Sequence, residues 1–470
     1  MTQKPHRGRT VIRGAQVLTQ DPDLGELRDA DVLIVDGVIA EIGHRLVVAD
    51  ALEIDAAGKL LIPGFVDTHR HTWQSLVRHL ATDWTLGQYF TGIHFGLSKH
   101  YRPEDTEVAN LLGALEALNA GVTTLVDWSH NLETPAHADA AIAGLRDSGL
   151  RAVFAHGGGA TMWAVPNEVR HTRDVLRIQR EHFGGGDSSG LLTLAFAARG
   201  PQFAPGQATL DDWQLARELG VRITVHVGDG EWGRSGPVRF MHEHGLTGPD
   251  VTYVHCNTLS DEELRIIADT GGTASVSADI ESQMGHGWPA TGRLLEAGVR
   301  PSLSIDVCSS TSGDMFSAMK TTISLQRALD NAQTDNADGQ VGVKLRCSDV
   351  LDFATVQGAV ATGQGDRIGS VSVGKQADLA LLSTSGLGTT PFNNPVGAIV
   401  YSGNIGMVDT VLVAGNTVKR DGVLLRDDLE AIRRRAVDAR DALFERARAE
   451  EGTADARTGG AWLPGALSAS

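Results

Sequence analysis

The sequence predicts an α/β protein: a (β/α)8 TIM-like barrel with a small β-sandwich domain built from both ends of the chain. Two observations predict this fold. Apolar runs alternate with helical stretches eight times between residues 61 and 369, and short alternating runs punctuated by turns lie on either side. In such a barrel the chemistry takes place at the C-terminal ends of the strands. A doubly wound sheet also alternates strands with helices, so alternation alone does not separate the two folds.

The eight barrel strands are predicted from apolar runs that are each followed by a segment with helical spacing. The strands are Leu61–His69, Val122–Trp128, Leu150–His156, Leu191–Ala198, Val221–Val227, Val251–His255, Thr273–Ser277 and Pro301–Asp306. A helical segment follows the first strand, and the later helices are placed at Pro135–Ser148, Asn167–Phe183, Leu210–Leu219, Val238–His244, Asp261–Thr270, Gly292–Ala297 and Asp314–Asp330.

The segments that flank the barrel have the texture of short strands. Thr10–Asp55 is one of them, and Ala377–Ser383, Gly397–Ser402 and Val408–Gly422 resemble it. We expect residues 1–60 and 370–425 to form one composite β-sandwich domain around a barrel domain of residues 61–369. Asp427–Glu450 has helical spacing, so residues 426–470 are predicted to form a C-terminal helix and a tail.

Composition and charge exclude several classes of protein. The net charge of −17 argues against nucleic acid and anionic membranes as partners. No apolar run approaches 18 residues, and the first residues lack the apolar core of a signal peptide. The three cysteines are widely separated and give no disulfide framework. We therefore expect a cytoplasmic protein that buries a large core.

Four predicted strands end in residues that can bind a metal. His69 and His71 end the first strand, His226 the fifth, His255 the sixth and Asp306 the eighth. A single histidine at a strand end is more often a hydrogen-bonded core residue, but these residues are all predicted at one face of the barrel. His69, His71 and His226 supply three nitrogen ligands, and Asp306 can complete the shell or accept a proton from a metal-bound water. His255 is left to hydrogen-bond the resulting hydroxide or the substrate.

Several further motifs accompany these residues. They are Pro63–His71, Gln74-Ser75-Leu76, Gly121-Val122-Thr123-Thr124, Gln283-Met284-Gly285 and Val373-Gly374-Lys375-Gln376-Ala377-Asp378. With the later His, His and Asp, the chain resembles the amidohydrolase superfamily, in particular the aminohydrolase and chlorohydrolase branch that contains triazine hydrolases and guanine-type and cytosine-type deaminases. The resemblance covers nearly the whole chain.

The resemblance implies one divalent metal per chain, zinc ahead of iron, and a homodimer or homotetramer. It implies that His255 orients substrate or water and that Asp306 acts both at the metal and as a base. The fourth predicted strand ends in Ala-Ala-Arg-Gly-Pro without a lysine, so the carbamylated-lysine, two-metal variant of the family is not expected.

One position departs from the family pattern. Deaminases of this branch carry glutamate three residues after the fifth-strand histidine, where this chain has Asp229. Aspartate is shorter by one methylene group, about 1.5 Å. Asp229 can serve as the proton shuttle directly or through a water, Glu231 can be the acid instead, or Asp229 can simply shape the loop between Gly228 and Gly230.

The sequence gives fewer indications of the residues that bind the substrate. The chain has eight tryptophans against four tyrosines, and most of the tryptophans lie in predicted loops, which indicates a flat heterocyclic substrate held by stacking. For any single tryptophan, packing of a loop onto the barrel is the better explanation. The residues predicted to bind the substrate are Gln74, Trp84, Trp128, Gln202, His286, Trp288 and Ser309, with the serine expected near Asp306 from the resemblance.

Together these features predict a mononuclear metal-dependent hydrolase that deaminates an aminated nitrogen heterocycle by attack of metal-bound hydroxide. The catalytic residues are predicted to be His255, Asp306 and either Asp229 or Glu231. Dechlorination, hydrolysis of a cyclic amide or a non-hydrolytic lyase step on the same scaffold remain alternatives, because Asp229 is unusual. A metal-free scaffold protein is a further alternative that the full set of ligands disfavours.

Overall fold

The computed structural model describes residues 8–163, 167–185, 190–333 and 342–451. Its centre is a sheet of eight parallel strands in the order β13-β12-β11-β10-β9-β8-β7-β6. The strands are β6 (Phe65–Arg70), β7 (Val122–Ser129), β8 (Arg151–His156), β9 (Leu192–Ala198), β10 (Arg222–Val227), β11 (Val251–His255), β12 (Thr273–Val276) and β13 (Ser302–Leu303). Consecutive strands pair in chain order and the segment after β13 returns to β6, so the predicted barrel is confirmed over a doubly wound sheet.

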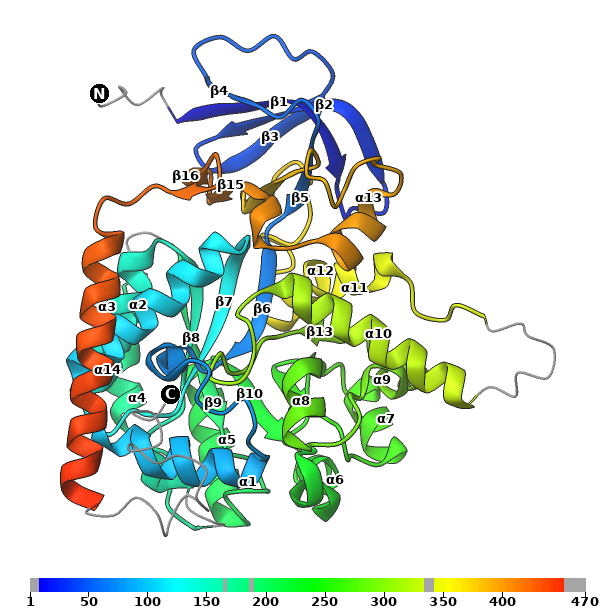
Figure 1. Cartoon of the computed structure of the whole chain (residues 1–470). Helices are drawn as coiled ribbons and strands as arrows, with labels where there is room; N and C mark the ends of the chain where they lie inside the picture. The colour runs from blue at the N-terminus through cyan, green and yellow to red at the C-terminus, as the bar shows by residue number, and fades with distance from the viewer. Residues whose placement is uncertain (1–7, 164–166, 186–189, 334–341, 452–470) are drawn as a thin grey trace.

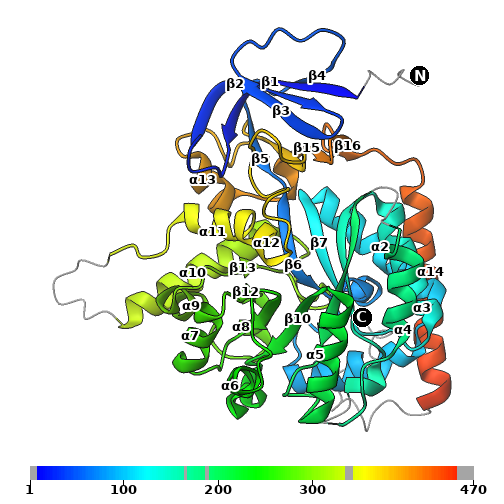
Figure 2. The ribbon, with the colours of Figure 1, turned by 180° about the vertical axis from the view of Figure 1, so that it is seen from behind.

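Helices surround this barrel on its outer face (Figures 1 and 2). They are α2 (Pro103–Asn119), α3 (Pro135–Ser148), α4 (Asp174–Ile178), α5 (Gln207–Leu219), α6 (Pro237–Glu243), α7 (Asp261–Asp269), α8 (Ala278–Met284), α9 (Thr291–Ala297) and α10 (Met315–Gln333). Their ends follow local chemistry: α3 begins with Pro135 and ends at the left-handed Gly149, and Ser260 and Glu263 form a capping box at α7.

The first predicted strand, Leu61–His69, is divided between two sheets. Residues up to Pro63 belong to β5 (Lys59–Pro63) of the chain-end sheet, and β6 begins after Gly64. A Cβ atom at Gly64 would lie 2.2 Å from the Thr123 side chain. The apolar run is therefore continuous in sequence, but the chain changes sheet where only glycine fits against β7.

Both ends of the chain contribute to a second, nine-stranded sheet at the top of Figure 1. With β5 it contains β1 (Arg9–Leu18), β2 (Glu26–Val35), β3 (Val38–Gly43), β4 (Leu52–Asp55), β14 (Leu379–Ser383), β15 (Val408–Val413), β16 (Asn416–Arg420) and β17 (Val423–Leu424). Its two halves join where β5 pairs with β14, and side chains from both halves share one apolar cluster. A buried ion pair links it to the barrel, because Arg151 of β8 contacts Asp378 at 2.7 and 3.0 Å.

One predicted strand is wrong. Gly397–Ser402 is helical: α13 (Pro395–Gly397) continues into a wider helical turn over Ala398–Ser402. The Asn394 side chain accepts a hydrogen bond from the Gly397 N–H at 2.9 Å, and Pro395 occupies the first helical position. These two start signals outweigh the strand-like apolar residues.

The remaining helices lie at the ends of the barrel and along its side. The helices α11 (Cys347–Phe353) and α12 (Val356–Ala361) pack near the start of β6, and α1 (Leu86–Tyr89) lies near its end. The C-terminal helix α14 (Leu429–Glu451) packs along α2, whereas the predicted tail lies outside the described residues. Within the described ranges, no helix combines the length and apolar character needed to cross a membrane.

Candidate active site

The barrel closes through the residues that were predicted to bind the metal. The Asp306 N–H donates to the His69 carbonyl oxygen at 2.9 Å, and the His71 N–H donates to the Asp306 carbonyl oxygen at 2.8 Å. Asp306 has a φ of 64°, a left-handed conformation that a non-glycine residue rarely adopts. The surrounding hydrogen bonds impose this geometry on Asp306, and the same bonds place its side chain beside the two histidines.

Three imidazoles and one carboxylate converge at this point. The ligand atoms of His69, His71 and His226 lie within 4.8 Å of one another. Asp306 Oδ1 lies 3.3 Å from His69 Nε2 and 3.4 Å from His71 Nε2. His71 Nδ1 contacts the Trp128 carbonyl oxygen at 2.8 Å, so Nδ1 carries the proton and the Nε2 lone pair is free.

Burial keeps these imidazoles neutral. It lowers the pKa of His71 to about 3, with help from repulsion by His69, and it lowers the pKa values of His69 and His226 as well. Burial alone would raise the pKa of Asp306, but the contact with His69 Nε2 and the nearby charge of His255 outweigh it and hold this pKa below its usual range.

Unpartnered nitrogen atoms mark the place where a ligand belongs. Among the described residues, both ring nitrogens of His69 and Nδ1 of His226 are buried without a hydrogen-bond partner. Orphaned buried polar atoms are costly, and neutral histidines with one carboxylate form a donor set that suits a four-coordinate divalent metal. The residues present therefore fit one such ion.

His255 lies next to this donor set and is surrounded by carboxylates. Its Nδ1 is 3.2 Å from Glu281 Oε1, and its Nε2 is 3.8 Å from Asp229 Oδ1 and 3.8 Å from Asp306 Oδ2. Burial lowers the pKa of His255, but Asp229, Glu281 and Asp306 together outweigh it and raise this pKa to about 9. The imidazole can therefore donate from both nitrogens.

Glu281 is a residue that the sequence analysis missed. It lies on α8, is fully buried, and also accepts hydrogen bonds from Asn257 at 3.3 Å and from the Ser277 N–H at 2.7 Å. These bonds fix the carboxylate that orients His255. The helix that carries Glu281 follows a predicted strand end, but no spacing rule distinguishes this glutamate from the other acidic residues of the chain.

The structure distinguishes the two candidate proton shuttles. Asp229 is buried, and its Oδ2 accepts a hydrogen bond from Gln202 at 3.1 Å. Burial raises its pKa to about 6, although His255 opposes the shift. The Glu231 side chain is 88% exposed and pairs with Arg234 at 3.1 Å outside the pocket. Only Asp229 of the two faces the cluster of buried histidines.

The direction of the Asp229 side chain depends on the preceding residue, Gly228. Gly228 has a φ of 81°, and a Cβ atom there would lie 2.7 Å from the backbone carbon of Cys256. The end of β10 can therefore approach the end of β11 only with glycine at this position. This close approach carries Asp229 toward His255.

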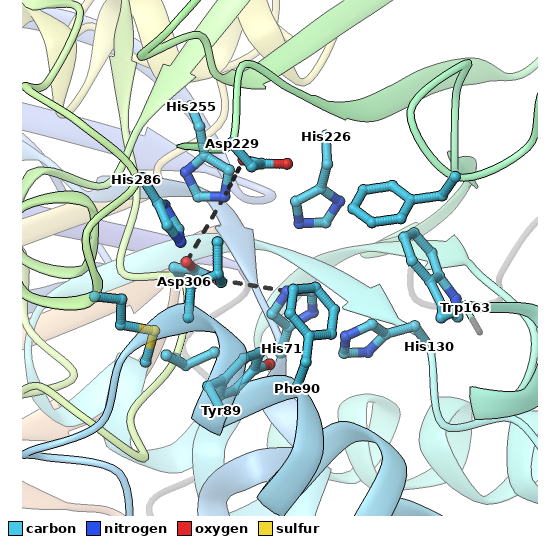
Figure 3. Close-up of a pocket in the computed structure, with 14 residues that line it drawn as sticks. His71, Tyr89, Phe90, His130, Trp163, His226, Asp229, His255, His286 and Asp306 are labelled. Carbon is cyan, nitrogen blue, oxygen red and sulfur yellow. Dashed lines mark ion pairs between the residues drawn. The ribbon is translucent and has the colours of Figure 1, made fainter. Parts of the chain in front are cut away.

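These groups line one narrow cavity at the C-terminal ends of the strands, with about 30 Å³ of space open to water-sized groups. Figure 3 shows Asp229, His255, His286 and Asp306 on one side of it and aromatic groups on the other. The lining residues are His71, Leu86, Tyr89, Phe90, His130, Trp163, Phe203, His226, Asp229, His255, Met284, His286, Asp306 and Val307.

The seven predicted substrate residues occupy different places. His286 lines the cavity, and neither of its ring nitrogens has a hydrogen-bond partner among the described residues. Gln202 bridges Asp229 and the Gly228 N–H, and Trp128 packs edge-on against His226 behind the cavity, with ring centroids 4.4 Å apart.

The other predicted residues lie farther from the cavity. Gln74 accepts a hydrogen bond from Ser309 at 2.8 Å and donates to Tyr89, so this pair supports the cavity wall. Trp84 is buried in the loop after the first barrel strand and does not line the cavity. Trp288 is 58% exposed and lines a separate surface depression. The sequence could not separate these positions from Phe90 or Trp163, because all are aromatic or polar loop residues.

Comparison with known proteins gives the family. The model of the amidohydrolase family matches residues 60–418. The 5'-deoxyadenosine deaminase of Methanothermobacter thermautotrophicus is 30% identical over 88% of this chain and 94% of its own length. The 5-methylthioadenosine/S-adenosylhomocysteine deaminase of Acetivibrio thermocellus is 27% identical over 90% and 96%.

Solved structures share the fold. An adenosine deaminase from Xanthomonas campestris with bound zinc superimposes with a TM-score of 0.81 at 24% identity, covering 92% of this chain and 98% of that one. The atrazine chlorohydrolase of Arthrobacter aurescens TC1, complexed with zinc, gives a TM-score of 0.80 at 21% identity, covering 92% and 100%. With a family match that spans most of its length, the chain belongs to the amidohydrolase family.

Proposed function

We propose that this protein is a metal-dependent hydrolase that deaminates an aminated nitrogen heterocycle. The observation that carries the proposal is the buried cluster of three neutral histidines and one carboxylate, faced by a second carboxyl group whose pKa is raised to about 6. Curated deaminases that are similar over about nine tenths of the chain support a carbon–nitrogen bond as the target.

His69, His71, His226 and Asp306 would hold one divalent metal, and we assign zinc ahead of iron. Neutral imidazoles and one carboxylate match the ligand preferences of zinc, and two structures with the same fold contain zinc. When bound, such a metal lowers the pKa of a coordinated water toward neutrality and so supplies the nucleophile.

The other polar groups of the cavity divide the proton transfers between them. Asp306, with its low pKa, remains ionised and can accept a proton from the attacking water. Asp229 in its protonated form donates to a ring nitrogen of the substrate, which makes the amino-bearing carbon more electrophilic and readies the amine to leave. His255 donates a hydrogen bond to the developing oxygen charge, and His286 contacts the heterocycle.

The first experiment measures ammonia release by zinc-loaded and iron-loaded protein on aminated pyrimidines, purines, pterins and triazines, with bound metal quantified in the same sample. We expect turnover of at least one class by protein that carries one metal per chain. The His69→Ala variant should lose both bound metal and turnover. Full activity in this variant, or no ammonia from any compound with the metal site filled, would overturn the proposal.

Chlorinated counterparts of the same heterocycles test the rival reaction on the same scaffold. Chloride leaves without being protonated, so dechlorination depends less on an acid at position 229 than deamination does. If chloride release exceeds ammonia release, and the Asp229→Asn variant retains it, the enzyme is a dechlorinase.

A further inference from the structure

A second cavity adjoins the first, and none of the residues that line it has a role in the proposed reaction. It offers about 210 Å³ of space to water-sized groups. Its lining residues are Gly87, Phe90, Thr91, Phe95, Trp163, Gln202, Phe203 and Trp232. Phe90, Trp163 and Phe203 line both cavities, so the two compartments share a wall beside the metal-ligand cluster.

The walls of this second compartment are aromatic. Phe90 stacks on Phe95 with ring centroids 5.8 Å apart, and it meets Trp232 edge-on at 5.4 Å. Phe203 packs against Trp163 at 5.4 Å and against Trp232 at 5.7 Å. These five rings come from four loops at the C-terminal ends of strands, namely those after β6, β8, β9 and β10. Such a surface favours a flat or alkyl group over a hydrated one.

The Thr91 and Gln202 side chains of this compartment already have partners. The Thr91 hydroxyl donates to the Gly87 carbonyl oxygen at 3.0 Å. The Gln202 amide donates to Asp229 at 3.1 Å and accepts from the Gly228 N–H at 2.7 Å. A hydroxyl group of a substrate would therefore lose water here without finding an equivalent partner, which costs binding.

Charge is missing from the second compartment. Among its described lining residues there is no lysine, arginine, histidine or carboxylate, and the charged groups Asp229, His255 and Asp306 belong to the first cavity. A phosphate or carboxylate group that entered the second compartment would find no counter-charge there. A pair of ribose hydroxyls would find no free acidic acceptor.

We infer that the substrate is an uncharged heterocycle carrying an apolar alkyl or aryl substituent, which lies in the aromatic compartment of Phe90, Phe95, Trp163, Phe203 and Trp232. This inference rests on the proposed function, since it takes the first cavity as the site of the reacting ring. It separates this chain from relatives whose names specify nucleoside substrates.

The test measures equilibrium binding of 9-methyl-, 9-ethyl-, 9-propyl- and 9-butyladenine to the zinc-loaded Asp229→Asn variant, in which binding is not complicated by turnover. Each methylene group that enters the compartment should tighten binding about fourfold, and therefore about 60-fold from methyl to butyl. Adenosine and 5'-deoxyadenosine should bind at least about tenfold more weakly than 9-butyladenine, because their hydroxyl groups would be left unpaired. Equal dissociation constants through the series, or tightest binding by adenosine, would overturn the inference.

Two further variants, each combined with Asp229→Asn, locate the substituent. Trp232 lines only the second compartment and Leu86 only the first. Trp232→Ala should reduce the gain per methylene group to about twofold or less, whereas Leu86→Ala should weaken all four ligands by one common factor. The reverse pattern would place the substituent in the first cavity and refute the assignment. A steep binding series without ammonia release from any compound would contradict only the proposed function, whereas ammonia release with a flat series would contradict only this inference.

Discussion

Replacing Asp229 with asparagine tests the proposed proton shuttle most directly. Asparagine has nearly the same shape, and its side-chain oxygen can still accept the hydrogen bond from Gln202. It cannot donate an acidic proton to the substrate. A general acid of this kind contributes about 10²–10⁴-fold to the rate. Because Asp229 is 4% exposed, solvent has little access to replace it, and we expect kcat to fall about 10³-fold below pH 6.

The pH dependence follows from the same carboxyl group. Burial raises the pKa of Asp229 to about 6, so the proton that it donates is present below pH 6 and is lost as the pH rises. At pH 7 only about one tenth of the molecules are protonated there, which reduces the expected effect of the substitution to about 10²-fold. The kcat/KM of the wild-type enzyme should therefore decline above pH 6, and the variant should lack this decline.

The assay is ammonia release from the best substrate of the panel between pH 5 and pH 8, with metal content measured for every sample. Asp229→Glu keeps an ionisable group and should keep the pH-dependent limb. Glu231→Gln removes an exposed carboxylate and should change kcat less than twofold. The reasoning is refuted if Asp229→Asn retains more than a tenth of the wild-type kcat at pH 5.5, or if its pH profile parallels that of the wild type.

Three other substitutions probe the metal site, the support of His255 and the contact between the two sheets. His226→Ala should weaken metal binding by more than about 100-fold, because removing a hydrogen-bond partner of a ligand already costs roughly 10–100-fold. Purified variant that still carries one metal per chain would contradict the role of His226 as a ligand. In metal-free protein the raised pKa of His255, about 9, contributes stability that is fully present below pH 6.5 and is lost as the pH rises through 9. Urea unfolding of the metal-free protein should show this loss of stability, up to roughly 3 kcal/mol. In the Glu281→Gln variant the loss should be smaller, because His255 no longer faces that carboxylate. An unchanged loss would show that the contact between His255 and Glu281 does not stabilise the protein. Arg151→Ala leaves the carboxylate of Asp378 buried and unpaired, so the free energy of unfolding should drop by about 3–5 kcal/mol, and a drop below 1 kcal/mol would argue against a buried charge there.

The sequence predicts the barrel well because each strand is an apolar run followed by a segment with helical spacing. The strands at Val251–His255 and Thr273–Val276 match the predicted boundaries to within one residue. The junction at Gly64 could not be predicted, since apolar periodicity does not reveal that neighbouring residues of one run pair with different sheets. The helical turn at Ala398–Ser402 shows the same limit, because capping by Asn394 competes with apolar composition.

The site divides along similar lines. The positions of His226 and Asp306 could be predicted because the end of a strand determines where its side chains lie. Their role as metal ligands stays a prediction. The direction of a loop side chain follows from contacts that are distant in sequence. Asp229 and Glu231 lie two residues apart in one glycine-containing loop, and only the packing of Gly228 against Cys256 separates the buried carboxyl from the exposed one.

The contact that closes the barrel, between Asp306 and the end of β6, has a consequence for the synthesis of the protein. Asp306 meets His69 and His71 through one main-chain hydrogen bond each, yet about half of the chain separates it from them in sequence. At about 5–20 residues per second, a ribosome completes the second partner on the order of ten seconds or more after the first. Until then the two histidines at the end of β6 have neither the carboxylate nor the final strand of the barrel beside them. We therefore expect acquisition of a metal to be a late event in biosynthesis, and a nascent chain that stalls before this point to expose imidazole donors without the pocket that selects what they bind.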